Sequence, residues 1–168
     1  MKLTANREIE ISSVKKLCYY LEDNLPDRKT IGIFLTVENT DYPNVRLLDN
    51  VLKIEVADTE VQERDDSFKV SDGMLVKKYL EREADFGKLY VCCDSGESRS
   101  TAMAAAIMRY FGVSDKEIWT NPMYHPNLLV YKNQLEAFGI KISKFKLKYL
   151  RYLSNKAFKT ATKKGLRK

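Results

Sequence analysis

The sequence predicts an α/β fold with a central, mostly parallel sheet flanked by helices. Short runs of aliphatic and aromatic residues, typical of buried strands, alternate along the chain with stretches of helical periodicity. Such alternation favours strands joined by helical crossovers, which pair in parallel. The chain has 168 residues, of which 44% are hydrophobic, so it is long enough to bury the core of one such domain.

The first half of the chain contains three predicted strands and one helix. Val14, Leu17 and Leu21 recur at helical spacing after a serine that can serve as the N-cap. The expected elements are, in order, a short strand over 1–7, a helix from Ser12 or Ser13 to Leu21, a buried strand over 31–37, a polar turn over 38–44 and a second buried strand over 51–56.

The second half continues the alternation of strands and helices. A charged stretch up to Asp66 predicts an exposed loop, and Ser71 can cap the helix that follows it. The remaining expected elements are a buried strand over 89–92, an Ala-rich helix over 100–111, a short segment containing Trp119 and a helix that ends near Gly139.

The charge of the chain is distributed unevenly. The net charge is +6, yet eleven of the 29 basic residues and none of the 23 acidic ones lie from Lys141 to the end. We therefore divide the chain into residues 1–140 and a basic amphipathic helix or tail over 141–168. The apolar residues of this tail recur at helical spacing, and we expect them to pack on the body: Ile142, Phe145, Tyr149, Leu150, Leu153 and Ala157. Its basic face suits weak contact with nucleic acid or an anionic membrane, and its end is expected to fray from about Lys159.

The segment with the clearest chemistry is CDSGESR, from Cys93 to Arg99. It joins a predicted strand to a predicted helix, and a short loop at a helix N-terminus directs several backbone N–H groups inward, where they can bind a phosphate. Gly96 allows the backbone angles that such a tight loop needs, and the planar guanidinium of Arg99 can bind two phosphate oxygens. The same positive field favours the thiolate form of Cys93, which makes this residue a candidate nucleophile.

The sequence CDSGESRS resembles the Cys-x5-Arg-Ser/Thr signature of the cysteine-dependent protein phosphatases, in particular the compact dual-specificity type. A later segment resembles the family's next helix through a pattern made of Pro126, Asn127, Gln134 and Leu135. The resemblance spans about residues 31–138 and implies a cysteine phosphatase-like catalytic domain over 1–140. The chain departs from the family at Cys92, where the family usually has a histidine.

The resemblance implies roles for individual residues. Cys93 is expected to attack phosphorus, Arg99 to stabilise the charge of the transition state, and Ser100 to donate a hydrogen bond to the sulfur. The substrate phosphate is expected to lie against the loop formed by Asp94, Ser95, Gly96, Glu97, Ser98 and Arg99.

The leaving oxygen needs a proton, so a carboxylic acid must reach this loop from another element. The family places that aspartate in a loop after a strand, upstream of the cysteine. Asp58 follows the predicted strand over 51–56 and precedes Cys93 by 35 positions, so the resemblance favours Asp58. Asp65 and Asp66, further along the same loop, remain the alternatives.

The expected function is hydrolysis of phosphotyrosine in proteins, extending to phosphoserine and phosphothreonine, with no metal ion and no cofactor. A phosphoinositide or RNA 5′-phosphatase, favoured by the basic tail, and a phosphate-binding pseudophosphatase, favoured by Cys92, remain alternatives. Three cysteines do not form a disulfide framework, and no stretch resembles a signal peptide or a membrane span. We therefore expect a cytoplasmic protein, which we take to be a monomer whose partner is a phosphorylated protein.

Overall fold

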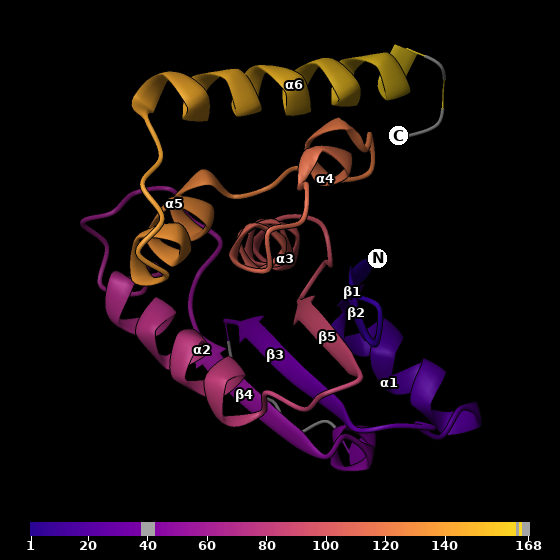
Figure 1. Cartoon of the computed structure of the whole chain (residues 1–168). Coiled ribbons are helices and arrows are strands. Elements are labelled where there is room, and N and C mark those ends of the chain that lie inside the picture. Colours follow the sequence, from indigo (N-terminus) through magenta and orange to yellow (C-terminus); the bar gives the residue numbers. More distant parts are fainter. Residues whose placement is uncertain (38–42, 164, 166–168) are drawn as a thin grey trace.

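The computed structural model describes residues 1–37, 43–163 and 165. Residues 38–42 of the predicted polar turn and the last residues of the predicted tail lie outside the described residues. In the described part, five strands form one sheet in the order β1-β2-β5-β3-β4 (Figure 1). The strands are β1 Lys2–Thr4, β2 Arg7–Ser13, β3 Thr30–Thr36, β4 Asn50–Glu55 and β5 Lys88–Cys93. Strand β1 is antiparallel to β2, and the other neighbours pair in parallel, so the predicted α/β class is confirmed.

Helices cover both faces of this sheet (Figure 1). The described helices are α1 Val14–Asp23, the 3-10 helix η1 Pro43–Leu47, α2 Val70–Arg82, α3 Arg99–Tyr110, α4 Lys116–Thr120, α5 Leu128–Ala137 and α6 Lys144–Lys163. Helix α1 and η1 lie on one face, and α2, α3 and α5 lie on the other. Helices α4 and α6 contact each other and form a further layer outside α3 (Figure 1).

The central strand β5 separates the two parts of the hydrophobic core. Successive side chains of a strand point to opposite faces of the sheet. Accordingly, Leu89, Val91 and Cys93 belong to the larger core on the α3 side, whereas Tyr90 and Cys92 belong to the smaller core on the α1 side. The two adjacent cysteines therefore face opposite sides of the sheet.

The N-terminal region differs from the prediction of a single strand over 1–7. The chain forms β1 and then a longer strand, β2, which pairs in parallel with β5 along its whole length. Its alternating Glu and Ile residues, from Glu8 to Ile11, are the period-2 pattern of a strand with one buried side. Ser13 ends β2 and caps α1, since its Oγ accepts a hydrogen bond from the Lys16 N–H at 3.1 Å.

The start of α2 also differs from the prediction that Ser71 is the cap. The helix begins at Val70, and Lys69 occupies the cap position. The Asp72 carboxylate accepts a hydrogen bond from the Lys69 N–H at 2.7 Å, so an acidic residue of the first turn satisfies the helix start.

Helix α6 packs on the body but does not bury all of its apolar residues. Leu150 and Ala161 are buried, whereas Phe145 and Tyr149, expected in the same buried stripe, are 83% and 47% exposed. The helix continues past Lys159, where fraying was expected, to Lys163. None of the helices in the described part is long and apolar enough to cross a membrane.

Candidate active site

The loop that carries the Cys-x5-Arg pattern lies between the end of β5 and the start of α3, at the carboxyl end of a parallel strand. Cys93 is fully buried at its base. The Gly96 N–H donates to Cys93 Sγ at 3.2 Å, and the Cys93 thiol donates to Ser100 Oγ, also at 3.2 Å. Ser95 Oγ lies 4.0 Å from the same sulfur. Hydrogen-bonding groups from the loop and from α3 therefore converge on one sulfur atom.

Gly96 adopts a backbone conformation that other residues rarely take, with φ of +77°. A Cβ atom added here would lie 2.6 Å from Ser13 N and 2.7 Å from Ser12 C, at the end of β2. Both contacts are closer than real Cβ atoms come to backbone atoms. The loop is thus folded directly against the end of β2, a strand that was not predicted from the sequence.

Arg99 lies at the start of α3, and its guanidinium is a buried cation, since only 3% of the residue's surface is exposed. Its Nη1 donates to the Val56 carbonyl at 2.6 Å, and its Nη2 forms an ion pair with the Asp94 carboxylate. Among the described residues, its Nε is buried and has no hydrogen-bond partner. An anion in the loop would satisfy this donor, because buried polar groups normally have partners.

Asp58 connects the loop after β4 to the phosphate loop. Its Oδ1 accepts hydrogen bonds from Ser98 Oγ at 2.8 Å and from Asn127 Nδ2 at 2.9 Å. The Ser98 side chain does not cap α3, and the first N–H groups of that helix have no partner inside the helix. The structure therefore brings Asp58 to the same loop as Cys93 and Arg99.

Asn127 is a site residue to which sequence reasoning gave no role. Its Nδ2 donates to Asp58 and to the Thr59 carbonyl, while its Oδ1 accepts from the Leu129 and Val130 N–H groups. One buried side chain thus caps α5 and holds the loop that carries Asp58. An asparagine directly before a predicted helix indicates a helix cap, so the capping role of Asn127 could have been found from the sequence. Its contact with Asp58 could not, because that contact joins distant parts of the chain.

The two alternative aspartates are placed differently from Asp58. Arg64 donates to both carboxylate oxygens of Asp66, at 2.8 and 2.6 Å. These hydrogen bonds lower the pKa of the Asp66 carboxyl below its ordinary value. Asp65 is exposed beside it. Asp58 thus contacts the phosphate loop through Ser98, whereas the carboxylate of Asp66 is engaged by Arg64.

Cys92 is fully buried on the α1 side of the sheet. Burial, and after it the neighbouring Cys93, raises the pKa of the Cys92 thiol well above its ordinary value. Cys92 therefore remains a neutral residue of the core.

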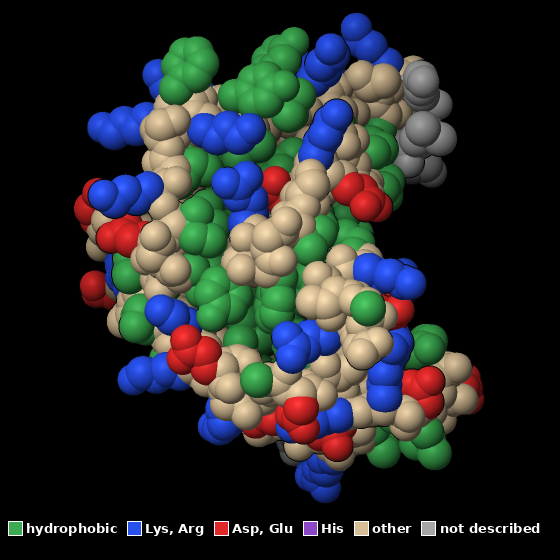
Figure 2. All heavy atoms as spheres, in the orientation of Figure 1, with side chains coloured by type: hydrophobic (Ala, Val, Ile, Leu, Met, Phe, Trp, Pro, Cys, Tyr) green, Lys and Arg blue, Asp and Glu red, His purple; other side chains and the backbone are tan. Residues whose placement is uncertain are grey.

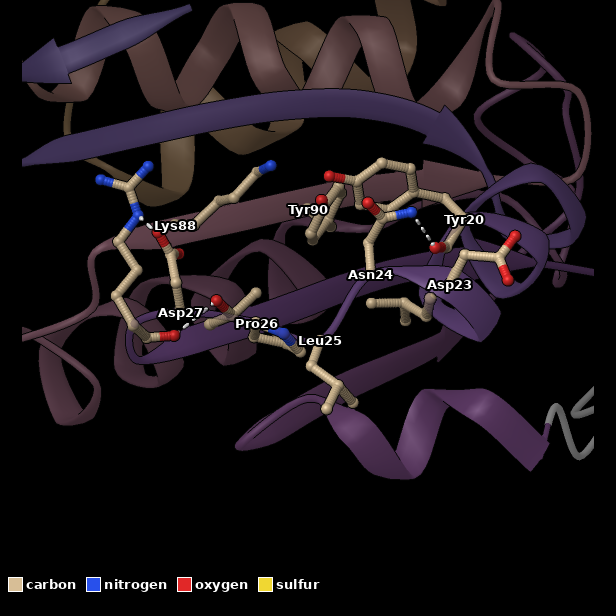
Figure 3. Close-up of a pocket in the computed structure, with 11 residues that line it drawn as sticks. Tyr20, Asp23, Asn24, Leu25, Pro26, Asp27, Lys88 and Tyr90 are labelled. Atoms are coloured by element: carbon tan, nitrogen blue, oxygen red, sulfur yellow. Dashed lines mark hydrogen bonds and ion pairs between the residues drawn. The ribbon is translucent and has the colours of Figure 1, made fainter.

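A polar hollow lies at the other end of β5. It has a volume of about 480 Å³ and lies beside the end of α1 (Figure 3). Its two cations, Lys88 and Arg28, are already paired with Glu10 and Glu8, each at 2.7 Å. In the described part of the chain, no group of three or more His, Cys, Asp or Glu side chains could hold a metal ion.

No family model matches the sequence, and no curated protein sequence matches it. Solved structures do resemble the chain. The structure of DUSP15 has a TM-score of 0.52 and 19% sequence identity, with 94% of this chain and 96% of that chain covered. PTPMT1 in complex with PI(5)P has a TM-score of 0.48 and 16% identity, covering 96% and 97%, and human DUSP28 has 0.47 and 15%, covering 82% and 94%. The likeness to DUSP15 shows that the chain has the dual-specificity phosphatase-like fold.

We predict that Gly96→Ala abolishes oxyanion binding, because its Cβ cannot fit against the end of β2. Gly112→Ala is the matched control: its φ is also positive, at +73°, but no described atom lies within 4 Å of the added Cβ. The control should lose only about 1 kcal/mol of stability from backbone strain and keep its affinity. Calorimetric titration with tungstate, beside urea unfolding, measures both quantities. Unchanged tungstate affinity in Gly96→Ala would contradict this view of the loop.

Proposed function

We propose that the protein is a phosphomonoester hydrolase that removes phosphate from phosphotyrosine in proteins, and also from phosphoserine and phosphothreonine, through a cysteinyl-phosphate intermediate. The observation that carries the proposal is the convergence on one loop of a buried Cys93 sulfur, a buried Arg99 with an unpartnered Nε, and Asp58. The dual-specificity phosphatase-like fold supports it. A reduced, cytoplasmic setting would keep the thiol available.

In the first step the Cys93 thiolate attacks phosphorus, so an S–P bond forms while the bond to the leaving oxygen breaks. Asp58 gives its proton to that oxygen. Loop N–H groups and Arg99 stabilise the charge on the three equatorial oxygens. In the second step water attacks phosphorus, Asp58 takes the proton from water, and the sulfur leaves as a thiolate.

Ser100 and Gly96 stabilise the sulfur in both steps. As a thiol, Cys93 donates to Ser100 Oγ. As a thiolate it has no proton, so the hydrogen bond reverses and the Ser100 hydroxyl donates to the sulfur. Together with the Gly96 N–H this hydrogen bond makes the sulfur a better leaving group.

Asp94 occupies part of the anion site before substrate binds. Its carboxylate pairs with Nη2 of Arg99, which is one of the groups that a phosphate would use. Substrate binding therefore replaces this ion pair, and the 44% exposed Asp94 side chain turns into solvent. The backbone N–H groups of the loop that are not bonded to Cys93 or Ser95 then hold the phosphate.

Two other functions compete with this proposal. Asp94 and Glu97 place carboxylates in the loop, which disfavours the highly anionic phosphoinositides and RNA 5′-phosphates. A pseudophosphatase would bind phosphate without turnover, and Cys92 in place of the family's usual histidine supports that reading because the histidine helps to order the loop. Turnover measurements distinguish it from the hydrolase.

We predict that the protein hydrolyses an aryl phosphate in the presence of a chelator and that Cys93→Ser lowers the rate roughly a thousandfold or more. Arg99→Lys should lose roughly a hundredfold or more, since Lys cannot bind two phosphate oxygens as a planar fork does. Steady-state hydrolysis gives both numbers, with Cys92→Ser as the control that keeps activity. Wild-type turnover in Cys93→Ser would show that the nucleophile is misassigned. Phosphopeptide binding without turnover would establish the pseudophosphatase.

We predict that Asp58→Asn slows hydrolysis of phosphotyrosine by roughly a hundredfold or more. The effect should be far smaller for an activated aryl phosphate, whose leaving group departs without a proton. The alkaline limb of the pH–rate profile should flatten in this variant, because that limb reports loss of the acid's proton. Asp65→Asn and Asp66→Asn are the controls. If either of them shows this leaving-group dependence while Asp58→Asn does not, that residue is the general acid.

We predict that Asp94→Asn binds tungstate several-fold more tightly than the wild type, because the oxyanion no longer displaces a carboxylate from Arg99. Asp65→Asn removes an exposed carboxylate from the neighbouring loop and should leave the affinity almost unchanged. Calorimetric titration of both variants checks this. Equal or weaker binding by Asp94→Asn would mean that the carboxylate does not compete for the site.

A further inference from the structure

Helix α6 presents an aromatic stripe to solvent. Phe145, Tyr149 and Tyr152 are 83%, 47% and 58% exposed, and their spacing places them on one side of the helix. The opposite side buries Leu150, Ser154 and Ala161 against the body. Figure 2 shows hydrophobic side chains and Lys or Arg side chains gathered over α6, at the top of the view. This outward face is not used by the packing of the fold.

The same face is strongly cationic. Residues 141–163 contain no acid and eight basic residues: Lys141, Lys144, Lys146, Lys148, Arg151, Lys156, Lys159 and Lys163. The seven lysines are exposed, and Arg151 is held at the edge of the face by an ion pair with Glu60. A shallow hollow of about 530 Å³ lies between α6 side chains from Lys148 to Lys163. The complementary partner is therefore anionic.

We propose that this face of α6 docks on an anionic membrane surface. A helix of 20 residues is about 30 Å long, and α6 lies along the outside of the molecule, where it can rest flat on a plane (Figure 1). Phe145 gains free energy on leaving water for the acyl boundary, and tyrosines favour the headgroup level. The lysines lie between and beyond the aromatic side chains, where they attract anionic headgroups.

A lipid surface fits the arrangement better than a nucleic acid does. Single-stranded nucleic acid is usually held in a cationic groove that follows its backbone, with bases stacked on aromatic rings. The hollow on α6 lies between Lys148 and Lys163, whereas the most exposed aromatic residue, Phe145, is the second residue of the helix and lies outside that hollow. The proposal does not depend on phosphatase activity, since it concerns a surface formed by α6 alone.

The first experiment uses Phe145→Trp in the full chain. The only native tryptophan, Trp119, is 1% exposed in the core, so a change in emission reports position 145. Vesicles of three parts phosphatidylcholine to one part phosphatidylserine should shift the emission to shorter wavelength, and lipids brominated on the acyl chain should quench it. Pure phosphatidylcholine vesicles should do neither. No spectral change with the anionic vesicles at low salt would overturn the proposal.

The second experiment measures vesicle co-sedimentation. Lys148→Gln combined with Lys156→Gln and Lys159→Gln should weaken binding at least tenfold, since each basic residue near the surface contributes several-fold. The matched control removes three exposed lysines elsewhere, Lys16→Gln, Lys53→Gln and Lys78→Gln, and should bind almost as the wild type does. Equal losses in both triple variants would mean a non-specific charge effect and would overturn the proposal.

The aromatic stripe is tested in the same assay. Phe145→Ser with Tyr152→Ser should weaken vesicle binding, whereas Leu75→Ser, which removes an exposed apolar side chain from α2, should not. Both variants should keep the aryl phosphate activity of the wild type, whatever that activity is. If the lysine variants instead lose binding to single-stranded RNA while the wild type ignores anionic vesicles, the face is a nucleic-acid surface and the membrane proposal is wrong.

Discussion

The burial of the Arg99 guanidinium at the start of α3 is the interaction on which the candidate site depends. A charged group with 3% exposure is costly unless other groups satisfy it. The Val56 carbonyl at the end of β4 and the Asp94 carboxylate satisfy two of its donors, and Nε remains without a partner in the described residues. The fold thus holds a cation that is paired well enough to be stable but still gains from an added anion. This is the physical condition for a phosphate site that is formed before its ligand arrives.

Part of this arrangement could be predicted from local sequence, because local residues determine it. The strand, the seven-residue segment and the Ala-rich helix are neighbours in the chain, so their order fixes Cys93 and Arg99 at the ends of one loop. The core face of β5 also follows from period-2 alternation, which separates Cys92 from Cys93. By contrast, the predicted strand over 1–7 ended where β2 begins, so β2 was missed; the turn between β1 and β2 is only two residues long and carries no Gly or Pro.

The contacts that complete the site could not be predicted, because they join residues far apart in the chain. Asp58 meets Ser98 across 40 residues and Asn127 across 69. The resemblance favoured Asp58 by its position after a strand, and Asn127 was identifiable only as an asparagine before a helix; nothing local indicates that the two share a hydrogen bond. The predictions that Ser71 caps α2 and that Phe145 is buried were wrong for a related reason. Asp72 replaced Ser71 as the group that satisfies the helix start, and Phe145 lies where the body offers no surface to cover it.

Glu60 connects the basic helix α6 to the loop after β4 that carries Asp58. Glu60 lies two residues after Asp58 in the chain. Its Oε1 accepts a hydrogen bond from the Leu128 N–H at 2.8 Å and forms an ion pair with Arg151 of α6. In water an ion pair whose side chains are 24% and 44% exposed contributes at most about 1 kcal/mol. The attraction grows when a neighbouring surface excludes water, because the effective dielectric constant falls. Covering the outward face of α6 would also remove hydration from both charges, and an anionic partner would compete with Glu60 for Arg151, so this ion pair is the point at which a partner on α6 would act on the loop that carries Asp58.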